Sequence, residues 1–428
     1  MNAHRILAAL VILAAAPHPS FAQPAPNVVT DWAAIVQQAI HNASAPRSGG
    51  TSQVLQTMVQ LAIYDAAVAV QGGYRPYAAD LALQPAADVR AAVAAAAYRT
   101  ARARVLPSQH AYLDQQYASY LLGLPDGPAK TEGVLVGEQV AEAILAARAD
   151  DGFGAVVPYE CSSFPPGVGE FEPDTGCPTS PSSPQPVDVK LGRIQPFALE
   201  RANQFRPDGP NSLSERSHAE DFAETRDYGR SDSAYRTPDQ TDAAYFWSEN
   251  PYVFWNRNLI ALATARGLGV LDAARFLAMT QTAVSDAIIA GFDAKYYYRA
   301  WRPRTAIPNA DLDGNRHTDA DPAWTPLLRV NHPEYPSGHG FWSTALTDAV
   351  AAFFGTTRVP MTLVVSRTNV PQVVRTERTY SDVNAVMREV TGARIWGGLH
   401  WRQSMQHGAQ VGRKVAAYVT KHLFGPVD

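Results

Sequence analysis

The chain has 428 residues, of which 46% are hydrophobic and 18% are charged. This composition can bury a sizeable core and excludes a disordered chain, and the length suits one large domain or two fused ones. The formal net charge of −4 does not indicate nucleic acid or an anionic membrane as a partner.

The first 22 residues have the pattern of a secretory signal peptide. Arg5 supplies a positive charge, and the apolar stretch from Ile6 to Ala16 is too short to span a bilayer. Ser20-Phe21-Ala22 then places small residues where a signal peptidase needs them. No later stretch reaches the roughly 18 apolar residues of a membrane helix. We therefore expect residues 1–22 to be removed and the mature protein to be soluble, in the periplasm or outside the cell.

Helical patterns dominate the rest of the chain, and no sustained alternation of apolar and polar residues indicates strands. A capping box at Thr237-Pro238-Asp239-Gln240 marks one helix start, and Pro251 is expected to end or kink that helix. The fold class is therefore predicted to be all-α. The other predicted helices are 53–71, 87–105, 108–122, 130–149, 268–301, 340–354 and 402–423.

Residues 152–190 are rich in proline, glycine and serine and are predicted to form a long loop. The loop separates an N-terminal helical region, 23–151, from a C-terminal region, 191–428. Both cysteines, Cys161 and Cys177, lie in it. Because an exported chain meets oxidising conditions, we expect a disulfide between them, with two free thiols as the alternative.

The first chemically informative block runs from Lys295 to Pro303. Lys295, Arg299, Arg302 and Arg304 lie in a window without acids, although such a run alone is more typical of a solvated helix face. Lys295 and Arg302 are two helical turns apart, which predicts that they share a face. Pro303 disfavours helical geometry at Arg302, so this arginine is expected at a helix end beside a cavity.

The second and third blocks each precede a predicted helix. In Pro336-Ser337-Gly338-His339, glycine permits close approach of the backbone, and the helix N-terminus favours an anion. In the block from Arg394 to His400, the pair Gly397-Gly398 allows a tight loop, so both end residues can converge. Either block alone is also compatible with a capped helix start and an incidental histidine. Together the blocks supply three fixed cations, two histidines, a serine and helix-end amides, which suit a tetrahedral oxyanion.

These blocks resemble the signature of the vanadium haloperoxidase and type 2 phosphatidate/acid phosphatase superfamily, in its exported bacterial haloperoxidase branch. That signature is lysine, six residues, Arg-Pro; then Pro-Ser-Gly-His; then Ser-Arg, five residues, His, three residues, Asp. The wider segments 301–307 and His332-Pro333-Glu334-Tyr335 are also similar. Ala393 replaces the family serine and Ser404 the family aspartate, which orients the histidine in the phosphatases. Ser404, or an acid from elsewhere, is expected to take that place.

The resemblance implies helical bundles of the haloperoxidase type and a vanadate cofactor, whose pocket phosphate also fits. It implies that His400 binds the vanadium, that His339 is the acid/base, and that Lys295 also polarises hydrogen peroxide. The implied oxygen-binding residues are Lys295, Arg302, Ser337, Gly338 and Arg394.

The implied activity is oxidation of halide by hydrogen peroxide to hypohalous acid, which then reacts with an organic acceptor. The alternative is an exported acid phosphatase, in which His400 forms a phosphohistidine and His339 protonates the leaving group. A non-catalytic oxyanion-binding protein is a third hypothesis, which the pair of histidines disfavours.

His332 lies seven residues before His339, about where the bromide-oxidising relatives carry an extra histidine. If His332 lines the pocket, its protonation is expected to tune the reaction with pH, and a polar wall favours bromide or iodide over chloride. A loop histidine without a role is equally compatible. The acidic segment from Asp311 to Asp321 lacks the spacing of a calcium loop and is predicted to be a turn-rich connector.

Overall fold

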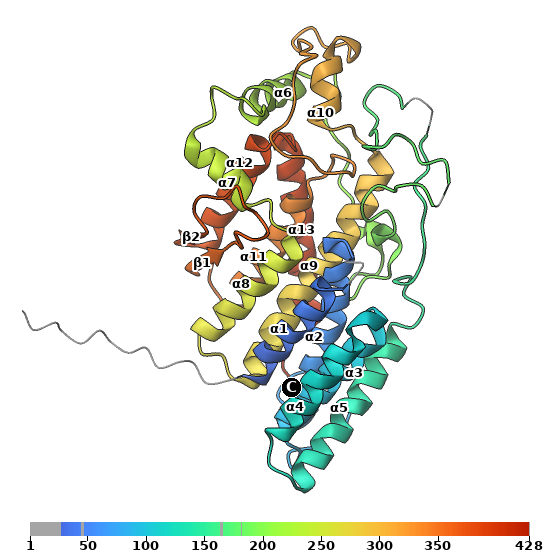
Figure 1. The fold of residues 1–428 in the computed structure, drawn as a ribbon, viewed down its shortest axis with the longest axis vertical. Coiled ribbons are helices and arrows are strands. Elements are labelled where there is room, and N and C mark those ends of the chain that lie inside the picture. The colour runs from blue at the N-terminus through green and yellow to red at the C-terminus, as the bar shows by residue number, and fades with distance from the viewer. Residues whose placement is uncertain (1–26, 44–46, 163–165, 181, 428) are drawn as a thin grey trace, which may run out of the picture.

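The computed structural model describes residues 27–43, 47–162, 166–180 and 182–427. The predicted signal peptide, residues 1–22, lies outside these ranges. Within them the chain forms thirteen α-helices, four short 3₁₀ helices and only two short strands, which confirms the all-α fold class. The molecule is elongated, with α3, α4 and α5 at one end and α6 and α10 at the other (Figure 1).

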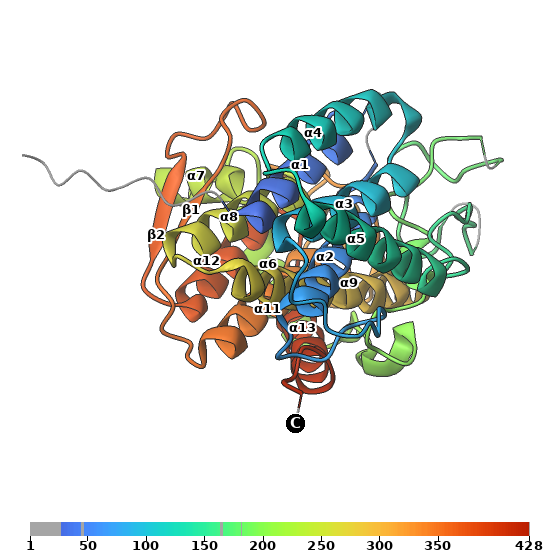
Figure 2. The ribbon, with the colours of Figure 1, turned by 90° about the horizontal axis from the view of Figure 1, so that it is seen from below.

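The N-terminal helices surround α2. By length and composition α2 could span a membrane, but its apolar segment is wholly buried within the protein. Helix α2 packs against α3, α5 and α9, as the view from below shows (Figure 2). Small residues let α3 and α5 approach closely, since a Cβ at Gly137 would lie 2.3 Å from the Ala92 carbonyl oxygen. The helices are α1 (Val28–His41), α2 (Gly49–Gln71), α3 (Val89–Arg104), α4 (His110–Leu122) and α5 (Pro128–Ala147), with η1 at Pro107–Gln109.

The C-terminal helices gather around α9, which contacts α2, α11 and α13 and so lies at the centre of the molecule. Helices α11 and α13 also meet through glycine, because a Cβ at Gly412 would lie 2.4 Å from the Phe341 carbonyl oxygen. The helices are α6 (Arg216–Gly229), α7 (Pro238–Phe246), α8 (Pro251–Ala265), α9 (Val270–Tyr298), α10 (Pro303–Ala306), α11 (Gly338–Phe354), α12 (Val383–Trp396) and α13 (Arg402–His422), with η2 at Leu191–Arg193, η3 at Ala202–Phe205 and η4 at Ile307–Leu312.

Most predicted helix ends differ from the observed ones by a few residues, and two differences change the interpretation. Helix α9 ends at Tyr298, because Arg299 adopts the left-handed conformation, with φ 50° and ψ 36°. Arg302 is therefore extended, with φ −97° and ψ 160°, as expected before Pro303, but it does not share a helix face with Lys295. Pro251 neither ends nor kinks a helix, since α7 already ends at Phe246 and Pro251 is the first residue of α8.

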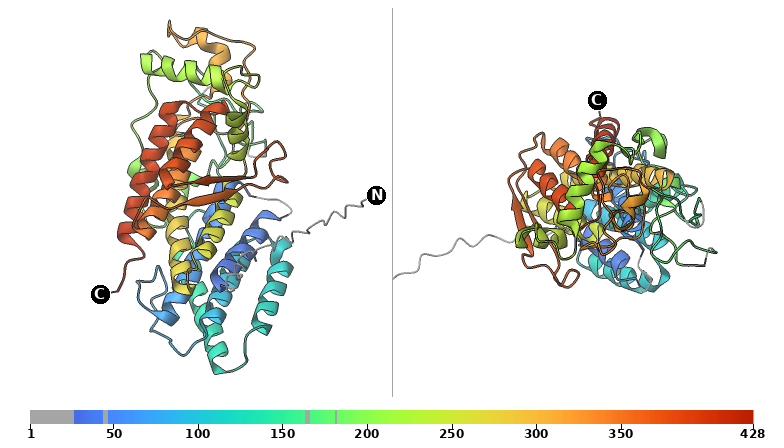
Figure 3. Two further views of the ribbon diagram at one scale, coloured as in Figure 1. Left: turned by 90° about the vertical axis from the view of Figure 1, so that its left-hand side faces the viewer. Right: turned by 90° about the horizontal axis from the view of Figure 1, so that it is seen from above.

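The long loop is irregular, as predicted: residues 152–190 hold no helix or strand at the positions described. Cys161 and Cys177 form a disulfide within it, which confirms the expected pairing. The antiparallel strands β1 (Met361–Val364) and β2 (Glu377–Tyr380) lie on the flank of the helices, where β1 packs on α8 (Figure 3). Neither Met-Thr-Leu-Val nor Glu-Arg-Thr-Tyr alternates strictly between apolar and polar residues, so the sequence pattern did not indicate these strands.

The acidic connector is held by hydrogen bonds among its own residues. The Asp313 carboxylate accepts hydrogen bonds from the Asn315 amide at 2.6 Å and from the Thr318 hydroxyl at 2.7 Å. Across the described part of the chain, no group of three histidines, cysteines or acids is placed to hold a metal ion. The hydrogen bonds of Asp313 are those of a turn-rich connector, as predicted.

Candidate active site

The three sequence blocks converge where α9, α11 and α12 end or begin beside one another. A cavity of about 400 Å³ lies there. Its wall includes five residues singled out from the sequence: His332, Gly338, His339, Arg394 and His400. Three others, Lys295, Arg302 and Ser337, are almost fully buried and do not line the cavity.

Lys295 stands at the C-terminal end of α9 and holds the segment that carries His332. Its ammonium group donates to the carbonyl oxygens of Pro333 at 2.8 Å and Glu334 at 2.9 Å. An ammonium has three N–H groups, so one is left for a further acceptor. Burial lowers the pKa of Lys295 well below its usual value, and the nearby Arg302 lowers it further. An anion beside Lys295 would offset both effects.

Arg302 joins the first block to the third. It donates to the carbonyl oxygens of His332 at 2.6 Å and Leu399 at 2.8 Å, and Leu399 directly precedes His400. Burial lowers the pKa of Arg302 to about 9. The left-handed turn at Arg299 brings this guanidinium back towards the end of α9. Lys295 and Arg302 therefore lie close together, as predicted, but because of this turn and not because they share a helix face.

Arg394 lies in the last turn of α12 and is the cation that lines the cavity itself. One guanidinium nitrogen, Nη1, donates to the Trp247 carbonyl oxygen at 2.8 Å. Its Nε is buried and has no hydrogen-bond partner among the described residues. Burial lowers the pKa of Arg394 to about 9, and Arg302 adds to this. A buried donor without an acceptor calls for an explanation, and an oxyanion would supply one.

The second block forms the N-terminus of α11. Ser337 is the N-cap, and its hydroxyl oxygen accepts from the Gly340 amide at 3.4 Å. The first amides of the helix have no intrahelical acceptor and favour an anion. A Cβ added at Gly338 would meet nothing closer than 3.9 Å, so a ligand can approach the backbone there. Burial, followed by the charge of Arg394, lowers the pKa of His339 well below its usual value.

His400 is held by an acid that the sequence analysis did not assign. Its Nδ1 lies 2.7 Å from Oε1 of Glu334, and both side chains are at most 2% exposed. Burial and the charge of Arg302 lower the pKa of His400 well below its usual value, which favours the neutral ring. With Nδ1 engaged, Nε2 is the nitrogen left for a ligand in the cavity.

Burial and the neighbouring cations act on the charge of Glu334 in opposite directions. Burial raises its pKa to about 7, against the opposing effects of Lys295 and Arg302. Ser404 lies beside it and also lowers this pKa, yet Glu334 Oε2 and the Ser404 hydroxyl each lack a well-formed hydrogen bond within the described ranges. The one signal that could have found Glu334 is its position, as the only acid between His332 and His339.

His332 does line the cavity, but its surroundings oppose a positive charge. Nδ1 of His332 lies 3.0 Å from Nη2 of Arg302, which can only donate, and 3.1 Å from the Pro333 carbonyl oxygen, which can only accept. Burial lowers the pKa of His332 well below its usual value, with Lys295 and Arg302 adding to the effect. These surroundings disfavour a positive charge on His332, and its expected role in tuning the reaction with pH stays a prediction.

Two acids in the cavity wall are bound by other groups. Asp188 accepts hydrogen bonds from the hydroxyls of Ser48 and Thr51, at the start of α2. Glu249 pairs with Arg257 and accepts from the Asn369 amide at 2.7 Å. Arg257 offsets the charge of Glu249, whereas burial raises the pKa of Asp188 and so disfavours its charge.

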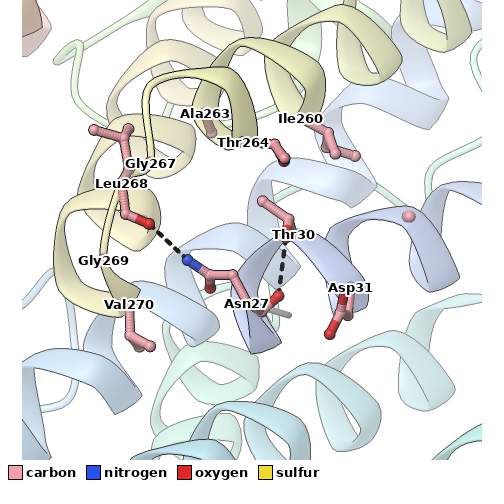
Figure 4. A pocket seen from close by; sticks show the side chains of 11 residues that line it. Asn27, Thr30, Asp31, Ile260, Ala263, Thr264, Gly267, Leu268, Gly269 and Val270 are labelled. Carbon is pink, nitrogen blue, oxygen red and sulfur yellow. Dashed lines mark hydrogen bonds between the residues drawn. The ribbon is translucent and has the colours of Figure 1, made fainter. Parts of the chain in front are cut away.

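A larger cavity, of about 550 Å³, lies between α1 and the turn that joins α8 to α9 (Figure 4). Its polar contacts are local: the Asn27 amide donates to the Leu268 carbonyl at 2.9 Å, and the Thr30 hydroxyl to the Asn27 carbonyl at 2.9 Å. Asp31 is its one ionisable lining residue, and no cation lines it. This cavity does not suit an oxyanion.

Comparisons with known proteins agree with the fold. Residues 275–428 match the family model described as the VCPO second helical-bundle domain. The crystal structure of a bacterial vanadium-dependent iodoperoxidase is similar, with a TM-score of 0.76 and 20% identity over 94% of this chain and 97% of that one. The structure of a holo-type bacterial vanadium-dependent chloroperoxidase has a TM-score of 0.73 and 18% identity, over 94% of this chain and 98% of that one. An apo-type structure has a TM-score of 0.71 and 19% identity, over 95% of this chain and 100% of that one. No curated protein sequence matches the chain.

Proposed function

We propose that this chain, whose fold and C-terminal bundle are those of the vanadium haloperoxidase superfamily, is a vanadate-dependent haloperoxidase. The observation that carries the proposal is the state of His400. Its Nδ1 is bound to Glu334, which leaves Nε2 as a lone-pair donor in a cavity beside three buried cations. A pure phosphate-binding or structural site needs no such oriented imidazole.

The residues present fit vanadate in two respects. Arg394 Nε is a buried donor without an acceptor, and Gly338 leaves space for a ligand against the start of α11. Lys295, Arg302 and Arg394 would offset the charge of the oxyanion, while His400 would supply the nitrogen ligand. Vanadate, when bound, supplies a Lewis acid that activates hydrogen peroxide for attack by halide, without change of oxidation state.

The protein side chains have separate tasks in this proposal. Lys295, which lies buried behind the cavity wall, would polarise peroxide with its remaining N–H. His339 lies in the cavity wall, and burial lowers its pKa. A ring nitrogen of His339 would accept the proton that peroxide releases and later return it. The substrates are hydrogen peroxide, a halide and an organic acceptor.

Halide preference is proposed to depend on His332, which places a polar ring in the wall 5.5 Å from the ring of Phe292. We propose oxidation of bromide or iodide, with little oxidation of chloride. His332→Phe removes the ring nitrogen beside Nη2 of Arg302 and replaces a polar ring in the wall by an apolar one. We expect the ratio of kcat/KM for bromide to that for chloride to change by about tenfold, the equivalent of one hydrogen bond.

His317→Phe is the matched control, because His317 also accepts from an arginine, Arg316, but is exposed and far from the cavity wall. It should leave the halide ratio unchanged. A His332→Phe enzyme with the same halide ratio as wild type, or a wild type that oxidises chloride efficiently, would contradict the assignment.

A phosphatase is the second candidate, because the Glu334–His400 contact serves either chemistry. The absence of an aspartate at position 404 weakened this alternative in the sequence, but a carboxylate does reach the imidazole from Glu334. A phosphoryl group bound by the same cations could be attacked by Nε2 of His400, with His339 protonating the leaving group.

One experiment separates the candidates. Purified apo protein is assayed for peroxide-dependent bromide oxidation, with and without added orthovanadate, and for hydrolysis of a generic phosphate monoester. We expect bromide oxidation that requires vanadate. Hydrolysis without any vanadate-dependent oxidation would replace the proposal by the phosphatase, and vanadate binding without turnover by the oxyanion-binding protein.

We also propose that the protein is exported, from the signal-peptide pattern of residues 1–22. N-terminal sequencing of the protein recovered from the periplasm or the medium should begin at Gln23. Recovery of the intact Met1 form from the cytoplasm would refute export.

A further inference from the structure

We propose that Glu334 is the positioning residue of His400, and that it supplies from the segment before α11 the carboxylate that the family signature carries at position 404. The inference rests on the proposed function in one respect, namely that His400 is the residue that binds the oxyanion. It assigns a role to an acid outside the three sequence blocks, and it applies to either chemistry of the site.

The geometry around Oε1 of Glu334 determines which atom carries the proton. Oε1 accepts from the Trp401 amide at 3.2 Å and lies 2.7 Å from Nδ1 of His400. Oε1 therefore acts as the acceptor between two N–H groups, so Nδ1 carries the proton and the lone pair of the imidazole is at Nε2. Without this contact, either nitrogen could hold the proton.

Glu334 is itself rigidly held, which makes it able to position another group. Its backbone amide donates to the Ala300 carbonyl at 2.9 Å, and its own carbonyl accepts from Lys295. Prolines stand at positions 333 and 336, which restrict the backbone on both sides. The backbone of Glu334 is therefore held by the same lysine that is proposed to serve the oxyanion.

Ser404 explains why this chain does not need the family aspartate. Its hydroxyl is buried beside Glu334 and lacks a well-formed hydrogen bond within the described chain, while its carbonyl accepts from the Ser337 amide at 3.1 Å. An aspartate at 404 would place a second carboxylate against the first. We infer that positions 334 and 404 are alternative sources of a single carboxylate.

The test uses the full-length apo protein and two variants, Glu334→Gln and the double variant Glu334→Ser with Ser404→Asp. Orthovanadate and phosphate affinities are measured by equilibrium dialysis. The tautomer of His400 is measured by NMR on protein labelled with ¹⁵N-histidine, with His400→Ala identifying the signal. Glu200→Gln, a change at an exposed glutamate, is the control and should behave as wild type.

We expect Glu334→Gln to weaken orthovanadate binding by about 10- to 100-fold, as for loss of an outer-sphere partner of a metal ligand. It should also shift the proton of His400 from Nδ1 towards Nε2, and the double variant should restore both properties. A purely structural role for Glu334 would not move the tautomer or be rescued from position 404.

The inference is overturned if Glu334→Gln keeps the wild-type tautomer and affinity, or if a folded double variant restores neither. If wild-type protein binds no orthovanadate or phosphate but Glu334→Gln shifts the tautomer, the proposed function fails while the positioning role of Glu334 stands. Because the NMR measurement needs no ligand, the two failures are distinguishable.

Discussion

His400→Ala should abolish bromide oxidation while the protein remains folded. His400 is the one cavity residue with an imidazole nitrogen oriented by a carboxylate, so its loss removes the proposed vanadium ligand. We expect kcat to fall about 10³-fold or more, the scale seen when a residue that acts within a catalytic unit is removed. The same variant should also lose phosphate-ester hydrolysis, because the alternative mechanism uses the same nitrogen.

The fold should survive because the backbone around position 400 is held by other groups. Arg302 donates to the Leu399 carbonyl, and the Thr225 hydroxyl donates to the carbonyl of residue 400 itself at 3.2 Å. Helical content by circular dichroism should stay near wild type. His41→Ala, a change at an exposed histidine of α1, is the control and should keep full activity. Activity of His400→Ala within a few-fold of wild type would rule out the assignment.

Lys295→Met should weaken orthovanadate binding by about 10- to 100-fold. A charge-assisted hydrogen bond contributes about 1.5–3 kcal/mol, and methionine keeps the length of the buried side chain without its charge. The loss in kcat should exceed the loss in affinity, because the same N–H is proposed to polarise peroxide. Equilibrium dialysis and steady-state kinetics measure the two effects separately.

Thermal unfolding gives an independent measure of the same binding. Orthovanadate at 100 times its Kd should stabilise the wild-type fold by about 2.7 kcal/mol, because it binds only the folded state. The melting temperature of Lys295→Met should respond much less at that concentration. Lys414→Met, on the exposed face of α13, should respond like wild type. An unchanged vanadate response in Lys295→Met would exclude Lys295 from the site.

Local signals in the sequence predicted much of the fold correctly. Both hydrogen bonds of the capping box between Thr237 and Gln240 are present. Ser337 is the N-cap of α11, at the helix start that the second block predicted. These features involve residues three positions apart, so their physics is contained in the local sequence. The short strands β1 and β2 were not predicted, because their pairing joins residues distant in the chain, such as Met361 and Tyr380.

The sequence by itself determined the residue types of the site and their order: the lysine and arginines, the Ser-Gly-His turn and the terminal histidine. Only the tertiary structure decided how they meet. The left-handed Arg299 returns Arg302 towards Lys295, and packing of α9, α11 and α12 brings Glu334 to His400 across 66 residues. Contacts of this kind depend on helix packing and on turns, which no spacing rule within one segment encodes.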